Sequence, residues 1–142
     1  MNVGTNPQNP AKIKVLIVDD HPILREGLST LINGQSDLMV CGESENGQEA
    51  LDKLKLAQET GSPYQFIICD WNMPVMTGLE LLEKRKDDPE LTNIPFLMVT
   101  IESELSYVMK AVSMGINDFI VKPFSQKTIE NKISRIYSKL NV

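Results

Sequence analysis

The stretch FIICDWNMP, residues 66–74, is an apolar run that ends in a single acidic residue. Its first four residues are apolar without alternation, as in a strand that is buried on both faces of a sheet. Asp70 closes the run, and the turn-forming residues Asn72 and Pro74 follow it closely. The stretch therefore predicts a buried strand that places Asp70 at its carboxyl end.

Similar apolar runs recur along the chain and alternate with segments of helical periodicity. The expected strands cover residues 13–19, 37–43, 65–70, 95–100 and 117–122. Each is followed by a segment whose apolar residues are spaced three or four apart, as in an amphipathic helix. Thr77 and Glu80 form a capping box at the start of the third helix. One face of the fourth helix is marked by Leu105, Val108, Met109 and Val112.

This alternation predicts an α/β fold with a five-stranded parallel sheet that is covered by helices on both sides. Because the crossover connections are right-handed, the doubly wound strand order 2-1-3-4-5 is the leading arrangement. In such sheets, ligands bind outside the carboxyl ends of the strands, near the point where the order reverses. Candidate functional residues are therefore expected at those ends.

The composition limits the number of domains and the kinds of partner. A chain of 142 residues with 42% hydrophobic content can bury one ordinary core, so a single domain over residues 13–142 is expected. Residues 1–12 are polar and contain two prolines, which predicts a flexible tail. A formal net charge of -5 argues against sequence-independent binding of nucleic acid. No apolar run approaches the roughly 18 residues of a membrane span.

The two cysteines, Cys41 and Cys69, both lie within apolar stretches. Nothing that resembles a secretory leader precedes them. We therefore expect reduced core thiols in a protein that is located in the cytoplasm.

Polar residues stand at the ends of four expected strands. Asp19 and Asp20 follow the first strand, Asp70 the third, Thr100 the fourth and Lys122 the fifth. Because the first and third strands are neighbours in the expected order, their carboxylates converge, and charges of one sign at short range call for a cation. Mg²⁺ suits such a site because it takes oxygen ligands. The expected ligands are the side chains of Asp19, Asp20 and Asp70 and the main-chain carbonyl of Asn72.

Lys122 and Thr100 add an ammonium and a hydroxyl group beside Asp70. Such a pocket suits a carboxylate that attacks phosphorus, because a metal, an ammonium and a hydroxyl donor neutralise the oxygens of the transferred group. Taken alone, each acidic residue has a simpler interpretation as the polar start of a helix or as a turn residue. The combination of four strand ends predicts that Asp70 is the nucleophile.

Four stretches resemble the receiver domains of two-component response regulators. VLIVDDHPILREGL, residues 15–28, resembles the start of many receivers in transcription factors. DWNMPVMTGLELL, PFLMVT and FIVKPF are most similar to chemotaxis regulators of the CheY type. The resemblance extends from about Lys12 to Leu140.

The resemblance implies a role for each residue at the strand ends. Asp70 is then the phosphoacceptor, with a sensor histidine kinase as the phosphodonor, and Asp19 and Asp20 bind Mg²⁺. Thr100 is the switch hydroxyl, and Lys122 is the lysine of the family motif. The resemblance also implies a cis peptide bond between Lys122 and the proline that follows it.

Three further positions match the family pattern. Phe119 falls at the position of an aromatic switch residue, although plain core packing explains it equally well. Asn72 and Glu102 match two positions that tune the loss of the phosphoryl group to water.

The expected function is that of a stand-alone phosphorylation-dependent switch, which catalyses only its own phosphorylation and dephosphorylation. Phosphorylation changes the face formed by the fourth helix, the fifth strand and the fifth helix, and so regulates a protein partner, as in chemotaxis or motility. A phosphatase is a further possible partner. One alternative is the receiver module of a transcriptional regulator without its output domain. A flavodoxin-like cofactor binder is disfavoured because the DDHP loop would repel a phosphate.

Two residue types that occur only once in the chain, histidine and tryptophan, lie close to these acids in the sequence. His21, the only histidine, is expected in a loop rather than as a phosphodonor or metal ligand. Trp71, the only tryptophan, borders Asp70 and should report on the occupancy of the site. The face formed by the fourth helix, the fifth strand and the fifth helix carries Lys110, Lys127, Lys132, Arg135 and Lys139. We expect these basic residues to be solvated, and a docking patch for an acidic partner is the alternative.

Overall fold

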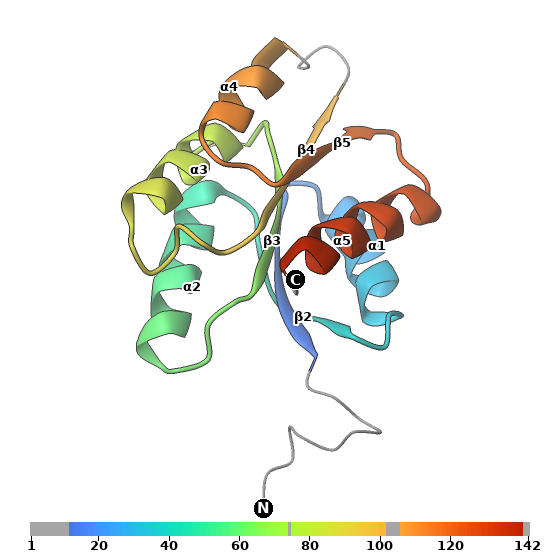
Figure 1. Ribbon diagram of the computed structural model, residues 1–142, viewed down its shortest axis with the longest axis horizontal. Coiled ribbons are helices and arrows are strands. Elements are labelled where there is room, and N and C mark those ends of the chain that lie inside the picture. The colour runs from blue at the N-terminus through green and yellow to red at the C-terminus, as the bar shows by residue number, and fades with distance from the viewer. Residues whose placement is uncertain (1–11, 74, 102–105, 141–142) are drawn as a thin grey trace, which may run out of the picture.

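The computed structural model describes residues 12–73, 75–101 and 106–140, in which strands and helices alternate (Figure 1). The strands are β1 (Ile13–Val18), β2 (Leu38–Ser44), β3 (Phe66–Asp70), β4 (Phe96–Ile101) and β5 (Asp118–Lys122). The helices are α1 (Pro22–Asn33), α2 (Gly47–Glu59), α3 (Gly78–Asp87), α4 (Val108–Ser113) and α5 (Gln126–Leu140).

The strands form one parallel sheet in the order β2-β1-β3-β4-β5. The predicted fold class and strand order are therefore confirmed. Helices α2, α3 and α4 cover one face of the sheet, and α1 and α5 cover the other (Figure 1). The order reverses between β1 and β3, so the carboxyl ends of these two strands lie at the centre of one edge.

The central strands β1 and β3 are buried on both faces, which explains their largely apolar sequences. All residues of β3 are buried. In β1, Leu16 packs in the cluster beneath α2 and α3, whereas Ile17 packs in the cluster beneath α1 and α5. Because both strands face two hydrophobic layers, the one polar side chain before their ends is the partly exposed Lys14, near the start of β1.

Local sequence signals fix several helix boundaries. Thr77 and Glu80 form both halves of the predicted capping box, which starts α3. The side chain of Asn46 accepts a hydrogen bond from the Glu49 N–H at 2.8 Å and caps α2. Gly115 follows α4 with a φ of 96°, a left-handed conformation that favours glycine.

The expectation of two core thiols was wrong for Cys41, which is exposed, and correct for Cys69, which is buried. The cause is the position of β2 at the edge of the sheet. Val15 pairs with Val40 and Leu16 with Gly42, so a β-bulge leaves Cys41 without a partner across the ladder. Its apolar neighbours in the sequence gave no sign of this bulge.

The face predicted for the fourth helix was only partly correct. Val108 is buried, but Met109 is 75% exposed and Val112 is 50% exposed. Ala111, three residues after Val108, forms the buried side instead. Leu105, which the prediction included, lies outside the described residues. Apolar residues on both sides of a short helix made the sequence pattern ambiguous.

Candidate functional site

The first two acidic residues lie at the carboxyl ends of the neighbouring strands β1 and β3. Val18 of β1 pairs with Cys69 of β3, so the residues that follow, Asp19 and Asp70, leave the sheet side by side. Asp19 is 1% exposed and Asp70 is 4% exposed. Buried carboxylates are costly unless a positive group balances them. The parallel register thus brings together two of the predicted residues and creates a need for positive charge.

Lys122, at the end of β5, supplies part of this charge. Its Nζ lies 3.4 Å from Asp70 Oδ1 and 3.6 Å from Asp19 Oδ2, and its side chain is 19% exposed. The peptide bond between Lys122 and Pro123 is cis, as the resemblance implied. One ammonium group therefore bridges two carboxylates that come from different strands.

Thr100 lies on the strand between Asp70 and Lys122. It follows Val99, which pairs with Asp70, and it is 1% exposed. Its hydroxyl donates a hydrogen bond to the Ile101 carbonyl at 3.3 Å. The structure thus places a buried hydroxyl at the same edge of the sheet as the acidic pair and the lysine.

The electrostatic balance of the pocket raises the pKa of Asp70 to about 6. Burial is the main cause of the rise, the Lys122 ammonium opposes it, and the Asp19 carboxylate adds to it. Burial likewise raises the pKa of the Cys69 thiol well above its usual value, which keeps this thiol protonated. Asp70 is therefore mostly ionised above neutral pH, in a pocket that still favours the arrival of further positive charge.

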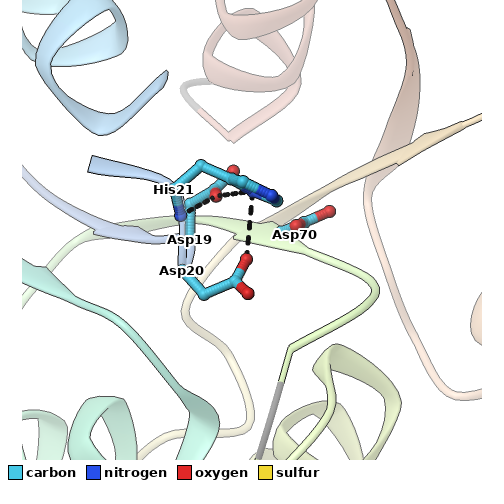
Figure 2. Close-up of side chains that lie close together, drawn as sticks. All are labelled: Asp19, Asp20, His21 and Asp70. Carbon is cyan, nitrogen blue, oxygen red and sulfur yellow. Dashed lines mark hydrogen bonds and ion pairs between the residues drawn. The ribbon is translucent and has the colours of Figure 1, made fainter. Parts of the chain in front are cut away.

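His21 and Asp20 complete the pocket, as Figure 2 shows. The ring Nδ1 of His21 lies 3.0 Å from Asp19 Oδ1 and 3.0 Å from Asp20 Oδ1. The main-chain N–H of His21 also donates to Asp19 Oδ1, at 2.8 Å. His21 lies outside the regular elements, directly before α1, as the sequence predicted, and its ring turns toward the acids. The adjacent DD pair was the only signal that could have predicted this.

The donor set fits a divalent cation. Ligand atoms of Asp19, Asp20, His21 and Asp70 all lie within 4.8 Å of one another. Within the described part of the chain, Asp20 Oδ1 is buried and lacks a hydrogen bond, although His21 Nδ1 lies close to it. A buried carboxylate oxygen without a donor is costly, and a bound cation would satisfy it. Oxygen-rich sites of this kind suit Mg²⁺.

The loop after β3 is held close to the carboxyl end of the sheet. The Trp71 N–H donates to the Val99 carbonyl at 2.8 Å, and the Gly78 N–H donates to the Trp71 carbonyl at 2.9 Å. A side chain at Gly78 would collide with the main-chain carbonyl of Asp70. Sequence reasoning missed this residue, although a glycine directly after a helix cap was a visible signal. Asn72 lies within this loop and is exposed.

Aromatic residues connect this edge with the neighbouring helices. The ring of Trp71 stacks on that of Tyr107 at a centroid distance of 5.2 Å and an angle of 22°. Phe119 of β5 is half-buried, and the Lys132 Nζ lies 5.5 Å from its ring centroid. Glu102 lies outside the described residues. Trp71 therefore joins the loop after Asp70 to the residues that lead into α4.

The model of the response regulator receiver domain family matches residues 15–134. The chain therefore belongs to this family of two-component signalling proteins. It is a receiver domain of the CheY type, which acts as a phosphorylation-dependent signalling switch rather than as an ordinary enzyme.

Chemotaxis proteins are among its relatives. The chain is 35% identical to chemotaxis protein CheY-3 of Vibrio cholerae over 130 residues, which cover 90% of this chain and 94% of the relative. It is 34% identical to chemotaxis protein CheY of Pseudomonas aeruginosa over 129 residues, which cover 91% and 99% of the two chains.

Solved structures agree with this relationship. CheY4 of Vibrio cholerae has a TM-score of 0.77 and 30% identity, and the match covers 89% of this chain and 99% of that chain. The receiver domain of the response regulator AraT from Geobacillus stearothermophilus has a TM-score of 0.76 and 30% identity, with 91% and 95% coverage. No helix in the described part of the chain has the length and apolarity needed to cross a bilayer.

Proposed function

We propose that this chain is a stand-alone chemotaxis-type switch in which Asp70 accepts a phosphoryl group from a sensor histidine kinase in the presence of Mg²⁺. The observation that carries the proposal is the position of Lys122, whose ammonium lies within 3.6 Å of both Asp70 and Asp19 in a buried pocket. This arrangement suits a reaction that adds negative charge to one carboxylate, because the balancing charge is already in place.

In the proposed reaction, a carboxylate oxygen of Asp70 attacks the phosphorus of a phosphohistidine on the kinase. The P–N bond breaks, its electron pair returns to the imidazole, and an acyl phosphate forms on Asp70. Lys122 stays near both carboxylates and binds an oxygen of the transferred group. The Asp19 and Asp20 side chains and the Asn72 carbonyl would hold Mg²⁺ beside Asp70, and this ion would neutralise part of the phosphoryl charge.

The signal then reaches the surface through β4 and β5. The added phosphoryl charge draws the Thr100 hydroxyl toward the phosphoryl oxygens, and Phe119 turns inward as that hydroxyl moves. The face made by α4, β5 and α5 thereby shifts its population between two states. Because binding and phosphorylation act on the same equilibrium, a partner that prefers the phosphorylated state also stabilises the phosphoryl group.

The similarity to two CheY proteins, of which the chain covers 94% and 99%, supports a chemotaxis-type switch. Exposed apolar residues on α4, Met109 and Val112, support a protein target on the face made by α4, β5 and α5. Asn72 and Glu102 are proposed to set the lifetime of the phosphoryl group, and a phosphatase is proposed as a further partner that would shorten it.

The test is phosphorylation by acetyl phosphate with Mg²⁺, followed by intact-protein mass spectrometry. The parent protein should gain one phosphoryl group that is labile to hydroxylamine, and the fluorescence of Trp71 should change in parallel. Asp70→Asn should gain none, whereas the matched variant Asp52→Asn, on the exposed side of α2, should behave like the parent. An adduct of equal yield in Asp70→Asn would refute the acceptor assignment.

A further inference from the structure

His21 is placed by the backbone, not by chance contact of a mobile side chain. It is the residue before α1, with φ of -100° and ψ of 107°, and Pro22 follows it at the first turn of the helix. A residue before proline is restricted to such extended conformations. Its side chain makes no capping bond to the helix, and its ring is turned toward the two acids instead. Little backbone conformational entropy is therefore lost when the ring acts at this site.

The distances around the ring match those between neighbouring ligands of one ion. Two ligand atoms that are each about 2.1 Å from an octahedral cation, at right angles to each other, lie about 3.0 Å apart. The Nδ1 of His21 is 3.0 Å from Asp19 Oδ1 and 3.0 Å from Asp20 Oδ1. Opposite ligands of such an ion lie about 4.2 Å apart, somewhat less than the 4.8 Å within which the whole ligand set, Asp70 included, falls.

The unsatisfied oxygen of the pocket lies beside this nitrogen. Among the described residues, Asp20 Oδ1 is buried and receives no hydrogen bond, and His21 Nδ1 is the nitrogen that lies near it. A hydrogen bond from the ring would satisfy only one of the two carboxylates at a time, because Nδ1 carries at most one proton. A shared cation satisfies both carboxylates and uses the lone pair of the ring.

We propose that His21 is a direct ligand of the divalent cation in this pocket, and that it shifts the preference of the site from Mg²⁺ toward transition ions that favour imidazole. The proposal rests on the proposed function, because it concerns the same acidic pocket. Carboxylate and water ligands suit Mg²⁺, whereas a nitrogen ligand raises affinity for ions such as Ni²⁺ and Zn²⁺. The cation affinity of this receiver site would then depend on His21, the residue directly after the two adjacent acids.

The single histidine of the chain makes a direct test possible. A protein without an affinity tag is loaded with Mn²⁺, and the electron spin echo is examined for coupling to ¹⁴N. Imidazole coupling can come only from His21, so the parent should show it and His21→Phe should not. The double variant with His21→Phe and Ile23→His restores one imidazole at a position that is 86% exposed, and it should show none.

Binding measurements with Ni²⁺ and Mg²⁺ complete the test. His21→Phe should lose about tenfold or more in Ni²⁺ affinity but only about twofold in Mg²⁺ affinity. Asp20→Asn should weaken both ions. Parent protein without nitrogen coupling, or a His21→Phe variant that binds both ions more tightly, would overturn the proposal, since the latter means that the ring competes with the cation.

The two proposals fail separately. If the parent forms the Asp70 acyl phosphate with Mg²⁺ but shows no nitrogen coupling, only the role of His21 is wrong. If nitrogen coupling appears and no acyl phosphate forms under any cation, the cation site stands and the proposed function fails.

Discussion

Two of the strand-to-helix junctions at the carboxyl edge of the sheet are built differently. Between β1 and α1, the Arg25 guanidinium donates to the Asp19 carbonyl at 2.6 Å and contacts Glu43 Oε1 at 3.4 Å, so two interactions hold the chain around the acids. Before α4, the ring of Tyr107 stacks on that of Trp71, which lies in the loop after β3.

The two helices also differ in length. Helix α1 has 12 residues and exposes Ile23, whereas α4 has six and exposes Met109 and Val112. A cation site needs fixed ligands, because misplaced ligands lose affinity. A responding surface needs an element whose two positions differ little in free energy. From this comparison we propose that the β1–α1 junction binds the cation and that the β4–α4 junction carries the response.

The largest effect is expected when the ammonium group of Lys122 is removed. This change tests whether the two junctions have separate roles. Lys122→Gln should lower the rate of Asp70 phosphorylation by acetyl phosphate about 10- to 100-fold, because one preorganised positive group is removed from the developing charge. Stopped-flow fluorescence of Trp71 measures this rate. Lys132→Gln, which removes a half-buried ammonium that pairs with Asp118 at the opposite end of β5, should leave the rate unchanged. A similar fall in the phosphorylation rate of both variants would contradict the binding role proposed for the pocket.

The pH dependence of stability tests the charge balance of the pocket. Because the pKa of Asp70 is raised to about 6, the protonated carboxyl is favoured in the folded state. This contribution is fully present below the unfolded pKa, near pH 4, and is lost as the pH rises through 6. A two-unit shift corresponds to about 3 kcal/mol, and screening by water reduces the expected loss to about 1–2 kcal/mol.

Urea unfolding in chelator at pH 4.5 and at pH 7.5 measures this loss, with Asp70→Asn as the control. The variant cannot ionise at this position, so it should be more stable than the parent at the higher pH and nearly equal at the lower pH. Added Mg²⁺ should restore the parent at the higher pH, because binding to the folded state alone stabilises it. Parallel pH profiles for the two proteins would contradict the charge balance described for the pocket.

The smallest expected effect concerns the response junction. Tyr107→Ala removes the stacking on Trp71 and should lower the free energy of unfolding by about 0.5–1.5 kcal/mol. The rate of phosphorylation, followed by mass spectrometry, should stay within about twofold of the parent, because no ligand or charge of the pocket changes. A fall as large as that expected for Lys122→Gln would show that the two junctions are not separate in function.

Much of the site was predictable because a parallel sheet imposes its own geometry. Apolar runs that end in Asp19, Asp70, Thr100 and Lys122 needed only the correct strand order to place these residues at one edge. Local signals such as the Thr77 capping box were equally reliable, since they depend on neighbours in the chain. The exposure of Cys41 and the buried side of α4 were not predictable, because a bulge and the packing of a short helix depend on residues far away in sequence.

By itself, the sequence determined the alternation of strands and helices, the receiver family and the identity of the acidic, hydroxyl and ammonium groups. The contacts between individual atoms of these groups depend on the packed fold and could not be predicted from the sequence. The reach of Lys122 to two carboxylates and the turn of the His21 ring toward Asp20 arise from the packing of distant segments. Hydrophobic periodicity and capping depend on residues that are close in the chain, so they can be predicted from sequence. Charge interactions and ligand geometry depend on distances in space between residues that are far apart in the chain.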